Sequence, residues 1–432
     1  MFDLTAIALV LATGFGCWAW KERVLLVNAV LLRLGGDVRV QITALEWEDG
    51  ALHAREVSTL HVPMAQHVAS VSHVEWRPSW SELSAGNLGG FKVEGATVDV
   101  PLAWLQPAPS PPGVAAAGTS RRWRLEFVDL AEAKVVVRDA AWKPLFSLFV
   151  TQKVEALEIG GPNSPSFQTI VTDLRRAEWG GKPVFNDAHL EMVMREDHLD
   201  LKQGSLRGGS IDLAWRREIS PALAAKLLPL TGGMQWEWEG RDLSLSSAGL
   251  TAGGTHDVRL KNLRLQWADD AGAVTADQVD LKVSQDSTGL WHVQNGLLMK
   301  PQVHWTPKLE ALLLPKGEST SKADWKVRVD ALEVKDGTAA LSATELSPVV
   351  GGFGWNTRLS ALEITPDGVK SASKQALEIT DVSLGWGRKE NSLQQPPFFQ
   401  LKTLKAEVVP DKLLDAWQVE SLVMTKPMIF GG

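Results

Sequence analysis

Hydrophobic and polar residues alternate with a period of two along most of the chain after residue 36. The alternation is clearest in VRVQITALEW from residue 38, WRLEF from 123, IDLAW from 211, VRLKNLRLQW from 258 and WKVRV from 325. A period of two sends successive side chains to opposite faces of a strand, so the pattern predicts β-strands with one apolar face.

Helical patterns are few and short. They occur around Trp80 to Leu83, around Ala222 to Leu230 and around Asp411 to Trp417. One helix per strand would be needed for a parallel α/β fold, and these patterns are too sparse for it. The chain is therefore predicted to be mainly β, with a few short helices.

A motif recurs three times in the part of the chain predicted to be sheet. Its copies are FKVEGATVDVP (91–101), WHVQNGLLMKP (291–301) and WQVESLVMTKP (417–427), each with an aromatic residue, Val two positions later and Pro ten positions later. After the first two copies the chain runs through a polar, low-complexity stretch to a Trp-led strand that begins at Trp123 or Trp325. The pattern predicts a repeat unit of strands that closes on a Pro-ended strand. A further linker and Trp-led strand are expected after the third copy, so the chain is expected to be a short or truncated example of the pattern.

These patterns divide the chain into six predicted segments. They are an anchor with a following helix that Gly35 and Gly36 can terminate (1–36), a first β repeat unit (37–104), a Pro/Ala/Ser-rich linker (105–120), a central β repeat region (121–305), a loop (306–324) and a C-terminal β repeat unit (325–432).

The Trp-led strands are predicted to have one strongly apolar face. Strict alternation separates this face from the polar neighbours Arg124, Glu126, Lys326 and Arg328. The residues expected on it are Trp123, Leu125, Phe127, Trp325, Val327 and Val329. Alternation cannot tell whether such a face lines an open groove or packs in a closed sandwich, and both alternatives stay open.

The N-terminal segment from Leu4 to Trp20 carries no charge over 17 residues, which is close to the minimum for a membrane-spanning helix. A cleaved signal peptide usually has a basic start and a small-x-small exit, and a lipoprotein signal would have to use Cys17 after Phe15. Neither fits well, so an uncleaved anchor is the favoured prediction. Lys21 and Arg23 follow the segment and no basic residue precedes it, which by the positive-inside tendency argues against export of the body.

Composition removes several classes of function. The formal net charge is -7, with 44 basic and 51 acidic residues and no basic cluster larger than a pair, so nucleic acid is not an expected partner. Cys17 is the single cysteine, which excludes intrachain disulfides and multi-thiolate metal sites.

No reactive motif stands out, since HExxH, GxSxG, a phosphate-binding loop and CxxC are all missing from the sequence. His61 and His67 are interpreted as surface residues of a loop, while Asp269–Asp270 and Glu196–Asp197 are interpreted as polar turns. We expect no catalytic centre, no cofactor and no metal site.

The order of these parts resembles the AsmA-like superfamily of bacterial envelope proteins, which is related in architecture to the chorein-type bridge lipid transporters. The resemblance rests on the anchor, the helix ending in Gly-Gly, the strand VRVQITALEWEDGALHAREV and the paired Pro-ended and Trp-led strands. It implies an elongated, curved antiparallel repeat sheet that forms a β-groove whose apolar face shelters acyl chains. It also implies a protein anchored by a single pass in the bacterial inner membrane with its body in the periplasm.

The resemblance implies that the chain binds and shelters or transfers phospholipid-like molecules, with the six residues of the Trp-led strands facing lipid. Other envelope proteins are possible partners. The rival interpretation is a membrane-tethered β-rich scaffold that acts in envelope assembly through protein partners. An open apolar groove would favour the first.

Overall fold

The computed structural model describes residues 23–25, 28, 38–63, 65–102, 122–159, 166–195, 198–213, 230–246, 249–267, 272–285, 290–306, 326–342, 349–365, 368–371, 373–386, 397–411 and 416–430. The chain divides into two compact units, residues 1–202 and 203–432. Strand β10 (His198–Asp212) contains the boundary between them.

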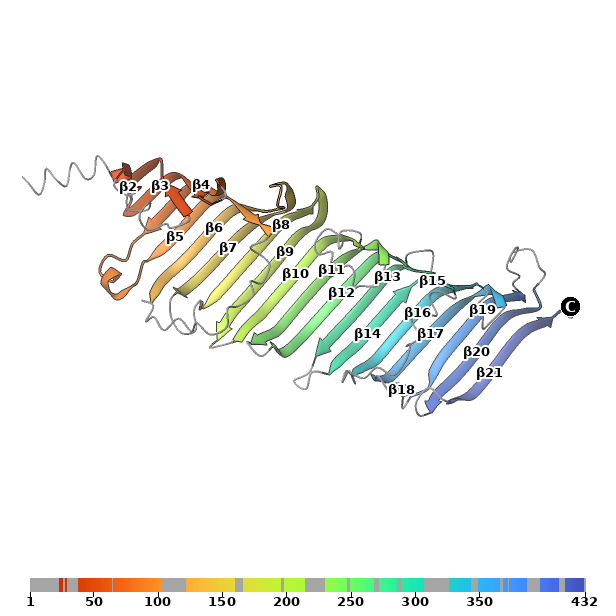
Figure 1. Cartoon of the computed structure of the whole chain (residues 1–432). Helices are drawn as coiled ribbons and strands as arrows, with labels where there is room; N and C mark the ends of the chain where they lie inside the picture. The colour runs from red at the N-terminus through yellow and green to blue at the C-terminus, as the bar shows by residue number, and fades with distance from the viewer. Residues whose placement is uncertain are drawn as a thin grey trace, which may run out of the picture. The chain divides into compact units, whose positions relative to one another are not determined.

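The first unit is a sheet of strands that follow one another in chain order (Figure 1). Strands β1 and β2 both pair with β3, and from β3 each strand pairs with the next as far as β9. The elements are β1 (Val38–Gln41), β2 (Ala44–Glu48), β3 (Ala51–His61), β4 (Gln66–Arg77), the 3₁₀ turn η1 (Leu83–Ala85), β5 (Gly90–Pro101), β6 (Trp123–Arg138), β7 (Pro144–Ile159), β8 (Thr169–Trp179) and β9 (Lys182–Arg195).

The second unit repeats this plan. Two short strands, β14 and β15, share the place between β13 and β16, and β18 and β19 both pair with β17. The strands are β11 (Leu230–Ser246), β12 (Gly249–Trp267), β13 (Gly272–Gln285), β14 (Trp291–Met299), β15 (Gln302–Trp305), β16 (Val327–Leu341), β17 (Val349–Thr365), β18 (Gly368–Ser371), β19 (Gln375–Trp386), β20 (Phe399–Asp411) and β21 (Ala416–Ile429).

The prediction of a mainly β chain is confirmed, but a purely antiparallel sheet is wrong. Strand β5 runs parallel to β6, and β14 and β15 run parallel to β16. Parallel neighbours need a crossover connection of a dozen or more residues, and both junctions coincide with the stretches 105–120 and 306–324 that were predicted as a linker and a loop. The first two Pro-ended motif strands, β5 and β14, therefore lie beside the strand that follows each long stretch and point in the same direction.

One of the expected helices is also corrected, because the segment around Trp80 contains only the 3₁₀ turn η1. Asp411 and Trp417, at the ends of another, belong to β20 and β21, and residues 412–415 between them lie outside the described residues. The segment before Leu230 lies outside the described residues, as does Leu4–Trp20. No helix within the described ranges is long and apolar enough to cross a membrane.

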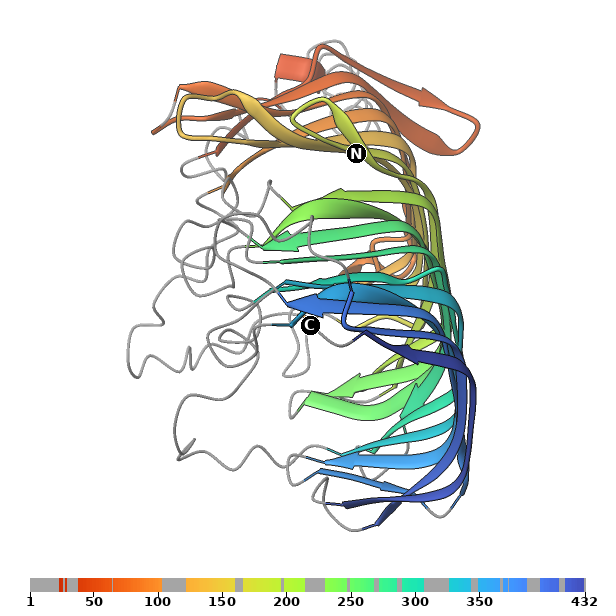
Figure 2. The ribbon, with the colours of Figure 1, turned by 90° about the vertical axis from the view of Figure 1, so that its right-hand side faces the viewer.

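Many strands contain one residue in the left-handed backbone region, where the strand bends. Glu56 in β3 (φ 49°), Asp336 in β16 (φ 53°) and Asp381 in β19 (φ 50°) are examples, and in β11 and β12 Asp242 (φ 59°) lies across from Gly254 (φ 61°). Such bulge-like residues change which face the next side chain occupies and increase strand curvature. The strands of each unit are accordingly bent along their length (Figure 2).

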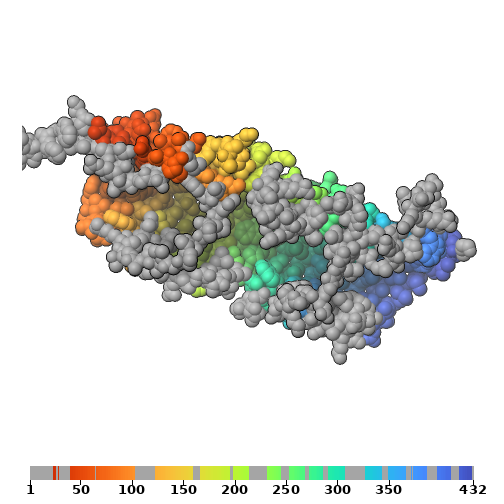
Figure 3. Space-filling view, in the orientation of Figure 1, coloured from red at the N-terminus to blue at the C-terminus, as the bar shows by residue number. Residues whose placement is uncertain are grey.

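Neither sheet has a packed second layer among the described residues, and few side chains are fully buried. Only 22 apolar side chains of the described part are buried, many of them alanine, and Trp267 (8% exposed) is the single aromatic one. In the space-filling view the strands of each unit recede from the viewer between their two ends, so this face is hollowed (Figure 3).

Candidate functional site: an apolar face and a charged face

An unbroken row of uncharged side chains crosses the sheet of the second unit. Each member lies directly opposite the next on the neighbouring strand, so all share one face. The row consists of Trp236, Leu260, Val279, Leu298, Val334, Thr357, Leu377, Ala406 and Leu422, from β11 to β21. Nine positions at about 4.8 Å per strand give a strip of roughly 38 Å.

The first unit contains an equivalent row on eight strands. Its members are Trp47, Leu52, Trp76, Phe91, Val128, Val154, Ile170 and Met192, from β2 to β9. None carries a charge. We call the face that bears these two rows the apolar face of each unit.

The residue next to each row member points to the other face, and there the side chains are mostly charged. In the first unit this second row is Glu46, His53, Glu75, Lys92, Asp129, Lys153, Val171 and Glu191. In the second unit it is Glu237, Arg259, Asp280, Leu297, Glu333, Arg358, Ala376, Glu407 and Ser421. We call this the charged face.

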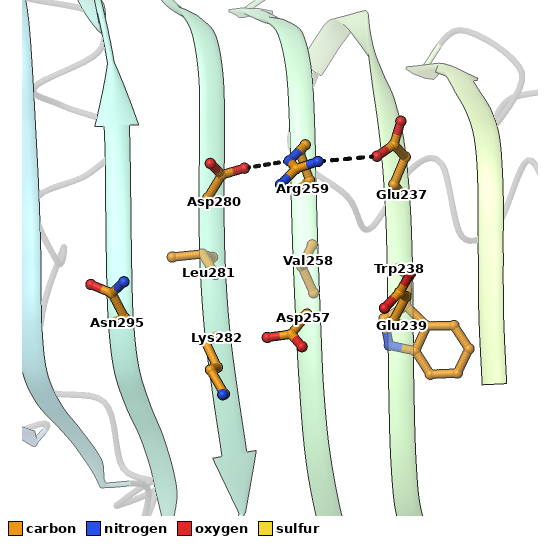
Figure 4. A pocket seen from close by; sticks show the side chains of 10 residues that line it. All are labelled: Glu237, Trp238, Glu239, Asp257, Val258, Arg259, Asp280, Leu281, Lys282 and Asn295. Carbon is orange, nitrogen blue, oxygen red and sulfur yellow. Dashed lines mark hydrogen bonds and ion pairs between the residues drawn. The ribbon is translucent and has the colours of Figure 1, made fainter. Parts of the chain in front are cut away.

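Alternating signs along the charged face produce ladders of ion pairs. Figure 4 shows Arg259 between Glu237 and Asp280, with nitrogen–oxygen distances of 3.6 Å and 2.9 Å. Arg358 and Glu333 form a similar pair at 2.8 Å. These side chains are 31–73% exposed, so each pair contributes little stability, and the face is adapted to water.

The apolar face is the more sheltered of the two. Val279, Val334 and Ala406 are 7%, 3% and 7% exposed although the described residues provide no second layer. Side chains crowd together on the inside of a bent sheet and spread apart on the outside. The exposures therefore indicate that each sheet bends toward its apolar face.

Aromatic rings gather at the β2–β5 end of the row in the first unit. Trp76 stacks on Phe91, with 5.9 Å between ring centroids, and Trp80 lies 5.8 Å from Trp47 and 6.1 Å from Trp76. The Trp76 indole donates a hydrogen bond to the Leu88 carbonyl oxygen. Trp80 is 62% exposed, so its ring is accessible to solvent.

Five of the six predicted lipid-facing residues lie in β6 and β16. The sixth, Trp325, lies outside the described residues. Val329 (4% exposed) lies opposite Leu362 and beside Val293, and Val327 lies opposite Ile364 and beside Trp291. Trp123 and Leu125 lie opposite Ile159 and Leu157, near the start of β6.

Phe127 differs from the others. It lies beside Gly90 and opposite Glu155, whereas its neighbour Val128 lies beside Phe91 in the apolar row. A Cβ atom on Gly90 would come within 2.0 Å of the Phe127 ring, so Phe127 covers Gly90 on the face opposite Phe91. The apolar row passes through Val128, which strict alternation from Trp123 does not predict.

The residues considered for metal or acid–base chemistry do not form a site. His61 and His67 belong to β3 and β4 rather than to a loop, and His67 is exposed. Asp269–Asp270 and Glu196–Asp197 lie outside the described residues. No group of three or more potential metal ligands occurs in the part of the chain that the structure describes.

Sequence reasoning missed most members of the apolar rows. Leu260 stands in VRLKNLRLQW, but which residues lie beside it depends on strand register, and register is a property of pairs of strands. The signal that could have found Phe91 and Leu298 is the motif itself, because they occupy its first and eighth positions.

The Glu333 carboxylate illustrates how the charged face depends on pH. Hydrogen bonds from Arg358 and Lys335 hold the pKa of Glu333 below its ordinary value of 4.5. Because folding lowers the pKa of Glu333, its ionised carboxylate stabilises the folded state. This stabilisation is complete above about pH 4.5 and is lost as the pH falls through the lower pKa of the folded state.

We therefore expect Glu333→Gln to lower the thermal unfolding midpoint at pH 7 by no more than about 2 °C, because the pair is exposed. The difference from the unmodified chain should shrink to nothing in thermal melts once the pH falls below the lowered pKa of Glu333 in the folded state. A difference that persists at low pH would show that Glu333 acts through packing.

No protein-family model, no curated protein and no solved structure matches this chain.

Proposed function

We propose that the chain is a non-catalytic, membrane-anchored envelope protein that shelters or transfers phospholipid-like molecules along its apolar face. The observation that carries the proposal is the uncharged strip that runs across eight strands in one unit and nine in the other, with no packed layer over it in the described residues. Soluble monomers rarely leave contiguous apolar surface of this extent without a ligand or partner.

Acyl chains suit such a strip for two reasons. The strip presents no charged group and few hydrogen-bonding groups, and acyl chains require neither. Its length of roughly 38 Å in the second unit exceeds that of a single acyl chain, so lipid could occupy successive positions along it. The charged face remains hydrated, which keeps the sheet soluble while the other face holds lipid.

The location proposed with this function is the bacterial inner membrane, with Leu4–Trp20 as a single-pass anchor and the body in the periplasm. The charge-free N-terminal segment supports the anchor, and the resemblance to AsmA-like proteins supports the periplasmic body. Protease accessibility with only the outer membrane permeabilised tests the location, because a body that is digested only after inner-membrane lysis is cytoplasmic.

Adjacent leucines of β14 allow a direct test of lipid contact. Leu298 belongs to the apolar row and Leu297 to the charged row, and both are partly exposed. We expect a photo-crosslinking amino acid at position 298, placed in cells labelled with radioactive phosphate, to capture phospholipid at least ten-fold more efficiently than the same residue at 297. Equal labelling at the two positions would contradict the proposal.

A further inference from the structure

We propose that an exposed patch on the first unit contacts the surface of a lipid bilayer. The patch consists of Leu25, Trp47 and Trp80, near the end of the sheet where β2 lies (Figure 1), and we call it the β2 patch. The inference rests on the proposed N-terminal anchor, but not on the proposed transfer of lipid. It goes beyond both because it assigns membrane contact to the folded sheet itself.

Five large apolar side chains are exposed among the described residues of the first unit, and three of them form the β2 patch. Leu25 (64%) and Trp80 (62%) are the most exposed of the five, followed by Trp47 (40%). The other two are Val62 (39%), in the β3–β4 connection, and Phe149 (38%), in β7. The Trp47 and Trp80 rings lie 5.8 Å apart, so their exposed surfaces adjoin.

The turn that carries Trp80 is fastened to the sheet on both sides of this residue. The Ser79 hydroxyl donates a hydrogen bond of 2.7 Å to the Glu126 carboxylate. The Leu88 backbone amide donates one of 2.8 Å to the Arg124 carbonyl oxygen. A turn held in this way presents the Trp80 ring to its surroundings, so the exposure of this apolar surface is part of the fold.

The chain itself holds the β2 patch next to the proposed anchor. Arg23 donates a hydrogen bond to the carbonyl oxygen of Leu45, which lies two residues before Trp47 in β2. Arg23 comes three residues after Trp20, where the charge-free segment ends. Three residues of chain reach at most about 11 Å. The β2 end of the sheet is therefore within reach of the headgroup layer when that segment spans a bilayer.

A second contact fixes the same connection to the sheet. The Asn28 side chain accepts a hydrogen bond of 2.8 Å from the Ile42 amide and donates one of 2.9 Å to the Ile42 carbonyl oxygen. Ile42 lies between β1 and β2. Leu25 lies between Arg23 and Asn28 in the sequence, so both contacts keep its exposed side chain near this end of the sheet.

The chemistry of the β2 patch suits the boundary between headgroups and acyl chains. Tryptophan combines a large apolar ring with a polar N–H group and is enriched at this boundary. Charge adds no net attraction, because three arginines and three glutamates surround the Trp80 turn. They are Arg77, Arg122, Arg124, Glu75, Glu82 and Glu126. Contact should therefore depend on the apolar side chains and should not require anionic lipid.

The test uses the full chain in phosphatidylcholine vesicles, with a fluorescent label on a single cysteine. In a Cys17→Ser chain, Ser81→Cys places the label beside Trp80 and keeps its ring. Lys153→Cys, on the charged face of β7, is the control position, and both positions are exposed. A nitroxide near the headgroup of the lipid should quench the label at 81 about five-fold more strongly than the label at 153.

Two substitutions in the chain labelled at 81 separate the Trp80 ring from general effects of added charge. Trp80→Glu should lower the quenching about three-fold or more, because a carboxylate resists transfer out of water. Phe149→Glu is the matched control, since Phe149 is also an exposed aromatic residue and the Lys134 ammonium lies 5.8 Å from its ring centroid. It should leave quenching at 81 unchanged.

A label on the original Cys17 reports on the anchor separately. Quenching at 17 without quenching at 81 would overturn the β2 patch and leave the anchor standing, whereas no quenching at either position would overturn both. Quenching at 81 that requires anionic lipid, or that disappears in concentrated salt, would assign the contact to charge and would also overturn the proposal. Lipid contact along the strip is tested independently by crosslinking at position 298.

Discussion

Lysine at position 298 should stop phospholipid transfer while leaving the protein folded. Leu298 lies in the middle of the apolar row, between Val279 and Val334, and an acyl chain that moves along the strip must pass it. An ammonium at this point has to be stripped of water whenever an acyl chain covers it, which costs several kcal/mol. We expect transfer to fall at least ten-fold.

The measurement is transfer of a fluorescent phospholipid from vesicles that contain the full chain to acceptor vesicles. Leu297→Lys is the matched control, because the same substitution on the neighbouring residue places the ammonium between the carboxylates of Asp280 and Glu333. Both variants should melt within a few degrees of the unmodified chain. Unchanged transfer by Leu298→Lys at normal stability would show that lipid does not use this face.

The second large effect that we expect is a loss of stability when Val329 is replaced by a charged residue. This side chain is 4% exposed and lies between Val293 and Leu362, so an aspartate there would be buried without a partner. We expect Val329→Asp to lower the free energy of unfolding by about 3 kcal/mol or more. Thermal melts and limited proteolysis of the second unit would measure it.

Val327→Asp is the comparison, because Val327 lies two residues earlier on the same strand and is partly exposed. Its carboxylate can stay hydrated when no ligand is bound, so the loss should be below about 1 kcal/mol. Equal and large losses at the two positions would mean that the whole apolar face is a closed core, and the scaffold interpretation would then gain support.

Strand content and the motif were predictable because both are local. Alternation identified β6, β12 and β16, and the spacing of aromatic and Pro residues identified β5, β14 and β21 as equivalent strands. The direction of pairing was not predictable. A long polar connection allows either direction, and the side chains of the two strands alternate in the same way in both.

The composition of the apolar row was predictable only as far as the first bend of each strand. Val327 and Val329 alternate, but the row continues at Leu332 and Val334, three residues after Val329, opposite the part of β17 where Ala361 has φ 50°. A residue in the left-handed backbone region shifts the alternation by one position, so later side chains of the strand point to the opposite face from the one that strict alternation predicts. Nothing in the side-chain pattern of one strand marks its position, because charged residues, alanine and glycine all occur there.

The two parallel junctions have one more consequence, which concerns how such a chain could change in length. At both junctions the Pro-ended strand meets the following Trp-led strand with the same spacing of side chains. A repeat unit inserted or removed between two such junctions would meet its neighbours through unchanged contacts and would extend or shorten the apolar strip by whole units. The distance that the strip covers is therefore set by copy number, a quantity that gene duplication alters without any new interface having to evolve.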